Sequence, residues 1–151
     1  MSVYTDFPFP ANSVLSIDSR SKFEFSENRM IYRAINSSQK KGYRLQIDGK
    51  LYSDETKKCD YGLLLEDGRF FLIELKGVDV SDACKQLITT LVLIKNDYSK
   101  YDFDFFCRIV ARQGLPKTNT NRQRLIKELG KMCKYSNDKF KSRVNFLEEK
   151  I

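Results

Sequence analysis

The chain has 151 residues, no histidine, four cysteines and a net charge of +7, with 27 Lys/Arg against 20 Asp/Glu. This length suits a single domain over residues 1–151 with one hydrophobic core, and hydrophobic residues at 41% are enough to fill it. The lack of histidine excludes Ser-His, Cys-His and His-metal mechanisms, so acid–base chemistry falls to carboxylates, Lys, Tyr and Cys. With no CxxC pair either, a zinc site is not expected.

Residues 1–21, which contain Pro8 and Pro10, are predicted to form an extended arm whose Phe residues pack on the domain or on a second subunit. Residues 26–40 are predicted to form a helix capped by Ser26. Its core-facing stripe, at helical spacing, would consist of Glu27, Met30, Ile31 and Ala34. The alternation of residues 43–47 predicts a strand, and residues 48–57 are predicted to form a polar loop.

Residues 58–76, KCDYGLLLEDGRFFLIELK, are predicted to form a β-hairpin. A three-residue loop over residues 66–68 would place Gly68 in the left-handed region. Asp60 then opposes Glu74, and Lys76 lies on the same face. A two-residue loop would instead shift the register by one and put Asp60 on the other face. Both faces are largely apolar, so we expect the hairpin to be covered on both sides.

The remaining elements follow from apolar periodicity and capping residues. Residues 82–94 are predicted to form a helix, and residues 104–111 a buried strand parallel to a hairpin strand. A cationic loop over residues 112–118 leads to a helix that begins at Asn119 or Thr120 and ends near Gly130 or one turn later. Residues 139–151 fit either a helix or an edge strand, and a closing strand is favoured.

The positive charge is concentrated at one end of the sequence. Residues 1–107 hold 15 Lys/Arg and 16 Asp/Glu, whereas the basic C-terminal part, residues 108–151, holds 12 and 4. Such asymmetry is typical of a surface that binds a polyanion, although a solvated lysine-rich surface gives the same count. The predicted nucleic-acid contacts are Arg112, Lys117, Arg122 and Arg124.

Two carboxylates and a lysine on one face of a buried sheet are costly unless something binds them. A divalent metal would bind Asp60 and Glu74, and metal-assisted phosphodiester cleavage fits this set best. The alternative is that Lys76 simply neutralises Glu74 at a strand end, with Asp60 solvated.

Around this hairpin the chain resembles the PD-(D/E)XK nuclease superfamily. The match is Asp60, a short hairpin, Glu74-Leu75-Lys76 and a following helix, although Cys59 stands where the motif has proline. The resemblance covers roughly residues 21–112. It implies an α/β, restriction-endonuclease-like fold, with a central mixed sheet of four to five strands flanked by helices in the order α-β-β-β-α-β. It also implies that Asp60 and Glu74 hold one or two Mg²⁺ or Mn²⁺ ions and that Lys76 positions the attacking water.

The resemblance extends to two further residues. Glu27 matches a metal-site glutamate on the first helix of Holliday-junction-resolvase-like members, although a first-turn Glu also stabilises a helix dipole. Gln86 matches a glutamine that assists at the phosphate, although it fits a solvated helix position equally well.

The expected function is therefore that of a metal-dependent endo- or exonuclease acting on nucleic acid, with DNA the preferred expectation and a homodimer plausible. A catalytically silent nuclease-fold module that binds nucleic acid or a protein partner is the alternative. A third possibility is a structural site in which Lys76 bridges Asp60 and Glu74 without metal.

The location is expected to be cytoplasmic. No apolar run approaches the length of a membrane span, and the first residues, MSVYTDFPFP, lack the layout of a secretory signal. The four cysteines are predicted to be reduced thiols, and three of them lie in apolar segments. The four are Cys59, Cys84, Cys107 and Cys133.

Overall fold

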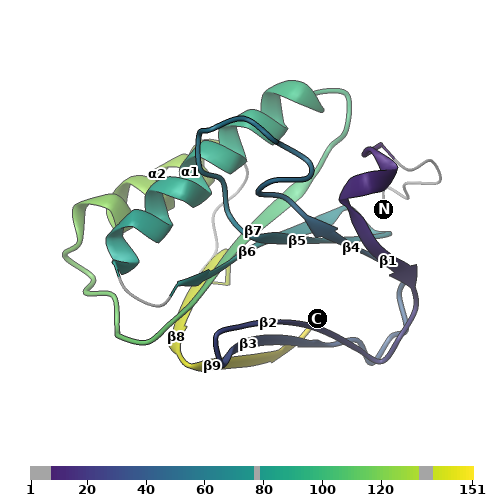
Figure 1. Ribbon diagram of the computed structural model, residues 1–151, viewed down its shortest axis with the longest axis horizontal. Coiled ribbons are helices and arrows are strands. Elements are labelled where there is room, and N and C mark those ends of the chain that lie inside the picture. The colour runs from purple at the N-terminus through teal and green to yellow at the C-terminus, as the bar shows by residue number, and fades with distance from the viewer. Residues whose placement is uncertain (1–7, 77–78, 133–137) are drawn as a thin grey trace.

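The computed structural model describes residues 8–76, 79–132 and 138–151, which form three layers. Figure 1 shows the helices α1 (Val80–Asp97) and α2 (Thr120–Met132) on one side of a large β-sheet and a smaller sheet on its other side. The protein is therefore an α/β protein with a mixed sheet, as expected.

The large sheet has six strands in the order β1-β4-β5-β6-β7-β8. Neighbours from β1 to β6 run antiparallel, whereas β6, β7 and β8 run parallel. Their bounds are β1 (Val14–Asp18), β4 (Gly42–Gln46), β5 (Tyr61–Leu65), β6 (Arg69–Lys76), β7 (Asp104–Ala111) and β8 (Phe140–Val144).

The small sheet has the order β2-β3-β9, with β2 antiparallel and β9 parallel to β3. Its strands are β2 (Lys22–Glu27), β3 (Met30–Ile35) and β9 (Phe146–Lys150). A short 3₁₀ helix, η1 (Ala11–Ser13), precedes β1.

The predicted hairpin register is confirmed. Tyr61 pairs with Ile73 and Gly62 with Leu72, so the same register places Asp60 opposite Glu74. Gly68 has φ 93°, and its amide donates to the Leu65 carbonyl at 2.9 Å, as a three-residue loop requires.

Both faces of the hairpin are buried, as predicted. Leu64, Phe70 and Leu72 belong to the core beneath the helices, together with Leu87 and Leu91 of α1. The alternate residues of the hairpin belong to a second core against the small sheet: Leu63, Leu65, Phe71, Ile73 and Leu75.

The helix predicted over residues 26–40 is wrong, because this segment forms the β2–β3 hairpin and part of the connection to β4. Its buried residues alternate with a period of two, with Phe23 and Phe25 in β2 and Met30, Tyr32 and Ala34 in β3. The turn places Asn28 and Arg29 at φ 50° and 67°. The small sheet thus covers the face on which a helix was expected, and the large sheet has six strands rather than four or five.

The other predicted elements agree in type. The succession β4-β5-β6-α1-β7 supplies a β-β-β-α-β order. Asn119 caps α2, its Oδ1 accepting the Arg122 amide at 3.0 Å. Residues 139–151 supply two strands, β8 and β9, rather than one. The N-terminal arm adds β1 and buries Phe9 against Phe70 and Phe103, while Phe7 lies outside the described residues.

Asn145 carries the chain from the large sheet to the small one. Asn145 has φ 64°. Its amide donates to the Ala111 carbonyl of β7 at 2.8 Å, and its carbonyl accepts the Ile31 amide of β3 at 3.1 Å. Val144 and Phe146, on either side, are both exposed. One residue therefore fixes how the edges of the two sheets meet.

A buried ion pair also joins the two sheets. The Nε of Arg108 in β7 lies 2.6 Å from Oε2 of Glu149 in β9, and the Tyr32 hydroxyl donates to the same oxygen at 2.7 Å. Burial opposes ionisation of Glu149, but the hydrogen bonds and charge of Arg108 prevail and hold its pKa below the ordinary value.

Within the described ranges, neither helix is both long enough and apolar enough to cross a membrane. Cys59, Cys84 and Cys107 are buried, and Cys133 lies outside the described residues.

Gly42→Ala should destabilise the protein, because the added Cβ would lie 2.4 Å from the buried ring of Phe23. We expect a loss of about 1–3 kcal/mol in the free energy of unfolding, measured by urea denaturation. Gly114→Ala is the control, since nothing lies within 4 Å of its added Cβ, and it should change stability by less than about 0.5 kcal/mol. Equal effects of the two substitutions would contradict this account of how the sheets approach.

Candidate acidic site at the strand ends of the large sheet

Acidic side chains from β2, β6 and α1, and from the residue before β5, gather near the end of β6. Asp60 directly precedes β5, Glu74 and Lys76 are among the last three residues of β6, and Glu27 is the last residue of β2. The first turns of α1 add Asp82 and Gln86. The hairpin register and the α1 connection therefore bring together residues that are far apart in sequence.

The Asp60 and Glu74 carboxylates each accept a hydrogen bond from a backbone amide across the hairpin. The Asp60 amide donates to Glu74 Oε1 at 3.0 Å, and the Leu75 amide donates to Asp60 Oδ2 at 3.0 Å. Glu74 is buried, with 2% of its surface exposed, while Asp60 is half-buried. The two carboxylates are thus fixed in orientation by the strands themselves.

Both carboxyl groups resist ionisation. Burial, followed by the charge of Asp60, raises the pKa of Glu74 to about 9. Burial also raises the pKa of Asp60 to about 6; the Leu75 amide opposes that shift and the charge of Glu27 adds to it. Such a pair favours a bound proton or a bound cation, because either relieves the repulsion between like charges.

Lys76 does not bridge the two carboxylates. Its Nζ lies 3.3 Å from Asp82 Oδ2, and Gln86 Nε2 donates to the same oxygen at 3.1 Å. Among the described residues, the carboxylate within 4 Å of Lys76 is that of Asp82. The charge of Lys76 still lowers the pKa of Glu74. The ammonium group therefore lies near the Asp60–Glu74 pair without forming an ion pair with either carboxylate.

Glu27 reaches the site from a strand rather than from the predicted helix. The Phe25 ring packs 5.3 Å from the Tyr61 ring, which sets the end of β2 over the start of β5. The charge of Glu27 contributes to the raised pKa values of both Asp60 and Tyr61. Its side chain is exposed and lies near enough to Asp60 for the two charges to interact.

The chemistry of the pair fits a hard divalent cation. Mg²⁺ commonly binds one or two protein carboxylates and fills its remaining positions with water and phosphate oxygens. Asp60 and Glu74 supply two carboxylates, with Lys76 displaced toward Asp82. No group of three or more metal-ligating side chains is found in the described part of the chain, so Glu27 does not complete a three-ligand cage.

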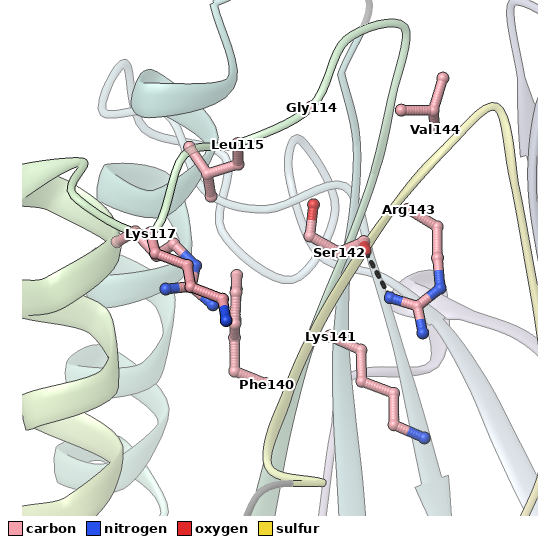
Figure 2. A pocket seen from close by; sticks show the side chains of 9 residues that line it. Gly114, Leu115, Lys117, Phe140, Lys141, Ser142, Arg143 and Val144 are labelled. Atoms are coloured by element: carbon pink, nitrogen blue, oxygen red, sulfur yellow. Dashed lines mark hydrogen bonds between the residues drawn. The ribbon is translucent and has the colours of Figure 1, made fainter.

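Three of the four predicted basic residues line two hollows, and the fourth, Arg124, lines neither. Arg112 follows β7, and its Nη2 donates to the Asn28 carbonyl at 3.3 Å beside a hollow lined by Asn28, Arg29, Arg112 and Asn145. Lys117 and Arg122 line a second hollow beside β8 (Figure 2). Arg124 is exposed but does not line it, because residues two apart on a helix point in different directions.

Sequence reasoning missed Asp82, Lys141 and Arg143. Asp82 opens α1 four residues before Gln86, a spacing that brings two helical side chains together. Lys141 and Arg143 alternate along β8 and line the second hollow. The alternation was visible in the sequence, but the position of β8 beside β7 depends on pairing between distant residues.

Comparisons with protein-family models, with curated proteins and with solved structures found no significant match.

Glu74→Gln should change how stability depends on pH. The folded protein holds the Glu74 proton more tightly than the unfolded chain does. The resulting stabilisation is fully present below the ordinary pKa of 4.5 and is lost as the pH rises toward about 9. Glutamine cannot ionise, so in EDTA the variant should be more stable than the wild type near pH 9, by on the order of 1–3 kcal/mol.

Urea denaturation across this pH range measures the effect. Glu55→Gln, an exposed substitution of the same kind, should keep the wild-type profile. If Glu74→Gln also runs parallel to the wild type, Glu74 is not the titrating group.

Proposed function

We propose that the protein is a metal-dependent nuclease with a restriction-endonuclease-like core, related to the PD-(D/E)XK superfamily. The observation that carries the proposal is the Asp60–Glu74 pair, which two backbone hydrogen bonds hold in place and whose pKa values are both raised. Keeping two like charges adjacent and partly desolvated costs stability. A binding site for a cation accounts for that cost.

The surrounding elements support the same proposal. Asp60, Glu74 and Lys76 stand on a β-hairpin followed by α1 and a parallel strand, which is the β-β-β-α-β portion of the expected order. The first helix of that order is absent from the segment where it was predicted, so the first-helix glutamate no longer supports a resolvase-like subfamily. DNA as the substrate and a homodimer with two sites remain expectations.

Each side chain has a distinct task in this proposal. Asp60 and Glu74 would hold Mg²⁺ or Mn²⁺, which when bound supplies a nucleophilic hydroxide and offsets charge on the phosphate. Lys76 positions the attacking water with its ammonium group. Asp82 restrains Lys76 through their ion pair, and Gln86 hydrogen-bonds Asp82 and points a polar group toward the same strand ends.

One observation favours the alternative of a catalytically silent binding module. Lys76 is engaged by Asp82, so a working lysine must leave or share that ion pair. In a silent module the acidic pair would stay protonated, and the basic hollows beside β7 and β8 would bind nucleic acid without cleavage.

Cleavage assays test the proposal. Labelled single-stranded, duplex and four-way-junction DNA and RNA would be incubated with the full chain in Mg²⁺, Mn²⁺ or EDTA. We expect metal-dependent cleavage that Glu74→Gln and Lys76→Ala each slow by about 100-fold or more. Lys85→Ala, an exposed lysine on the same helix as Gln86, should cleave at the wild-type rate.

Metal binding can be measured separately from cleavage. Mg²⁺ should raise the melting temperature of the wild type and leave that of Glu74→Gln unchanged, because only the wild type offers both carboxylates. Salt-sensitive binding of nucleic acid with no cleavage of any substrate would favour the silent module instead.

A further inference from the structure

Four cationic side chains line a groove at strand β8, which forms one edge of the large sheet. This groove of about 460 Å³ lies between β8 and the loop that leads into α2, and its basic residues are Lys117, Arg122, Lys141 and Arg143. Figure 2 shows Lys117 on the α2 side of β8, with Lys141 and Arg143 on the opposite side. None of the described residues lining this groove is acidic.

Most of this charge is available to a ligand. Within the described residues, no carboxylate lies within 4 Å of Lys117, Arg122 or Arg143, whereas Lys141 lies 3.0 Å from Glu149. Arg122 is held in place, because its guanidinium packs 5.3 Å from the centre of the Phe140 ring. The groove is therefore a partly fixed cationic surface of the kind that binds phosphates.

An exposed aromatic ring stands next to this groove. Phe146, with 45% of its surface exposed, begins β9. The Arg33 guanidinium lies 5.1 Å from the centre of the ring and is itself held by Glu24 and Glu148, each at 2.9 Å. The ring is thus supported by a fixed cation while much of its surface stays open to solvent.

The β8–β9 turn makes the groove and the ring continuous. Val144 lines the groove, Asn145 lines the hollow that contains Arg112, and Phe146 lines a third hollow with Lys141 and Arg143. Three consecutive residues thereby lie along three hollows. The first two have basic but no acidic residues among their described lining, whereas the third, at Phe146, also contains Glu148 and Glu149. The Arg112 hollow also includes Asn28, the residue after Glu27, so the path leads toward the acidic site.

We propose that this path binds single-stranded nucleic acid, with phosphates beside Lys117, Arg122 and Arg143 and an unpaired base stacked on Phe146. A duplex hides the faces of its bases within its own stack, so its bases cannot stack on the exposed Phe146 ring. Single strands offer base faces and phosphates together. This inference assigns a substrate class to the proposed nuclease and rests on that function for its role in cleavage.

Binding in EDTA separates recognition from chemistry. Fluorescence anisotropy of the full chain would be measured with labelled oligothymidylate, oligouridylate and a blunt DNA duplex over a series of salt concentrations. We expect tighter binding to the single strands than to the duplex. The oligothymidylate and oligouridylate arms tell which of the two the path prefers.

Phe146→Leu keeps apolar bulk against Arg33 but removes the ring, and should weaken single-strand binding about 5- to 150-fold while leaving duplex binding unchanged. Phe146→Trp should retain single-strand affinity. Arg143→Gln should weaken binding and reduce the slope of log affinity against log salt by about 0.7. Lys127→Gln removes an exposed charge of α2 outside the groove and should have neither effect.

The outcomes separate the two proposals. Single-strand binding that needs Phe146 but comes with no cleavage upholds this path and refutes the nuclease. Metal-dependent cleavage with equal affinity for duplex and single strand, and no effect of Phe146→Leu, upholds the nuclease and overturns the path. An absence of binding to all three probes also overturns the path.

Discussion

The register of the β5–β6 hairpin determines which groups meet at the acidic site. The loop that ends at Gly68 sets that register, and cores on both faces of the hairpin hold it. A slip by one residue would exchange the two faces and move Asp60 away from Glu74. The hydrophobic interior thus holds two carboxyl groups side by side although repulsion between their charged forms opposes that arrangement.

Each of the three layers contributes residues to the acidic site. The large sheet provides Asp60, Glu74 and Lys76, the helical layer provides Asp82 and Gln86, and the small sheet brings Glu27 into electrostatic range. The hydrogen bonds between Asp60 and β6 are the more rigid part, because each ties a carboxylate to a backbone amide of the hairpin. The contacts of Lys76 and Gln86 with Asp82 join side chains, so they can rearrange without disturbing the strands.

The sequence predicted the hairpin well because its determinants are local: a turn glycine and two apolar runs. It failed over residues 26–40, where Glu27, Met30, Ile31 and Ala34 match a helical face although the buried positions alternate as in strands. The Asn28–Arg29 turn contains no glycine or proline to mark it. The contact between Lys76 and Asp82, and the groove beside β8, depend on how α1 and β8 pack, which no local pattern encodes.

The ion pair between Arg108 and Glu149 limits when the two sheets can close during synthesis of the chain. Tyr32 and Arg108 leave the ribosome well before Glu149, yet both contact its carboxylate. A nascent chain that has not reached β9 must either keep the guanidinium hydrated or bury it uncompensated, and the latter costs several kcal/mol. Closure of the two sheets is therefore tied to the synthesis of β9, and a chain truncated before β9 stays open to proteases.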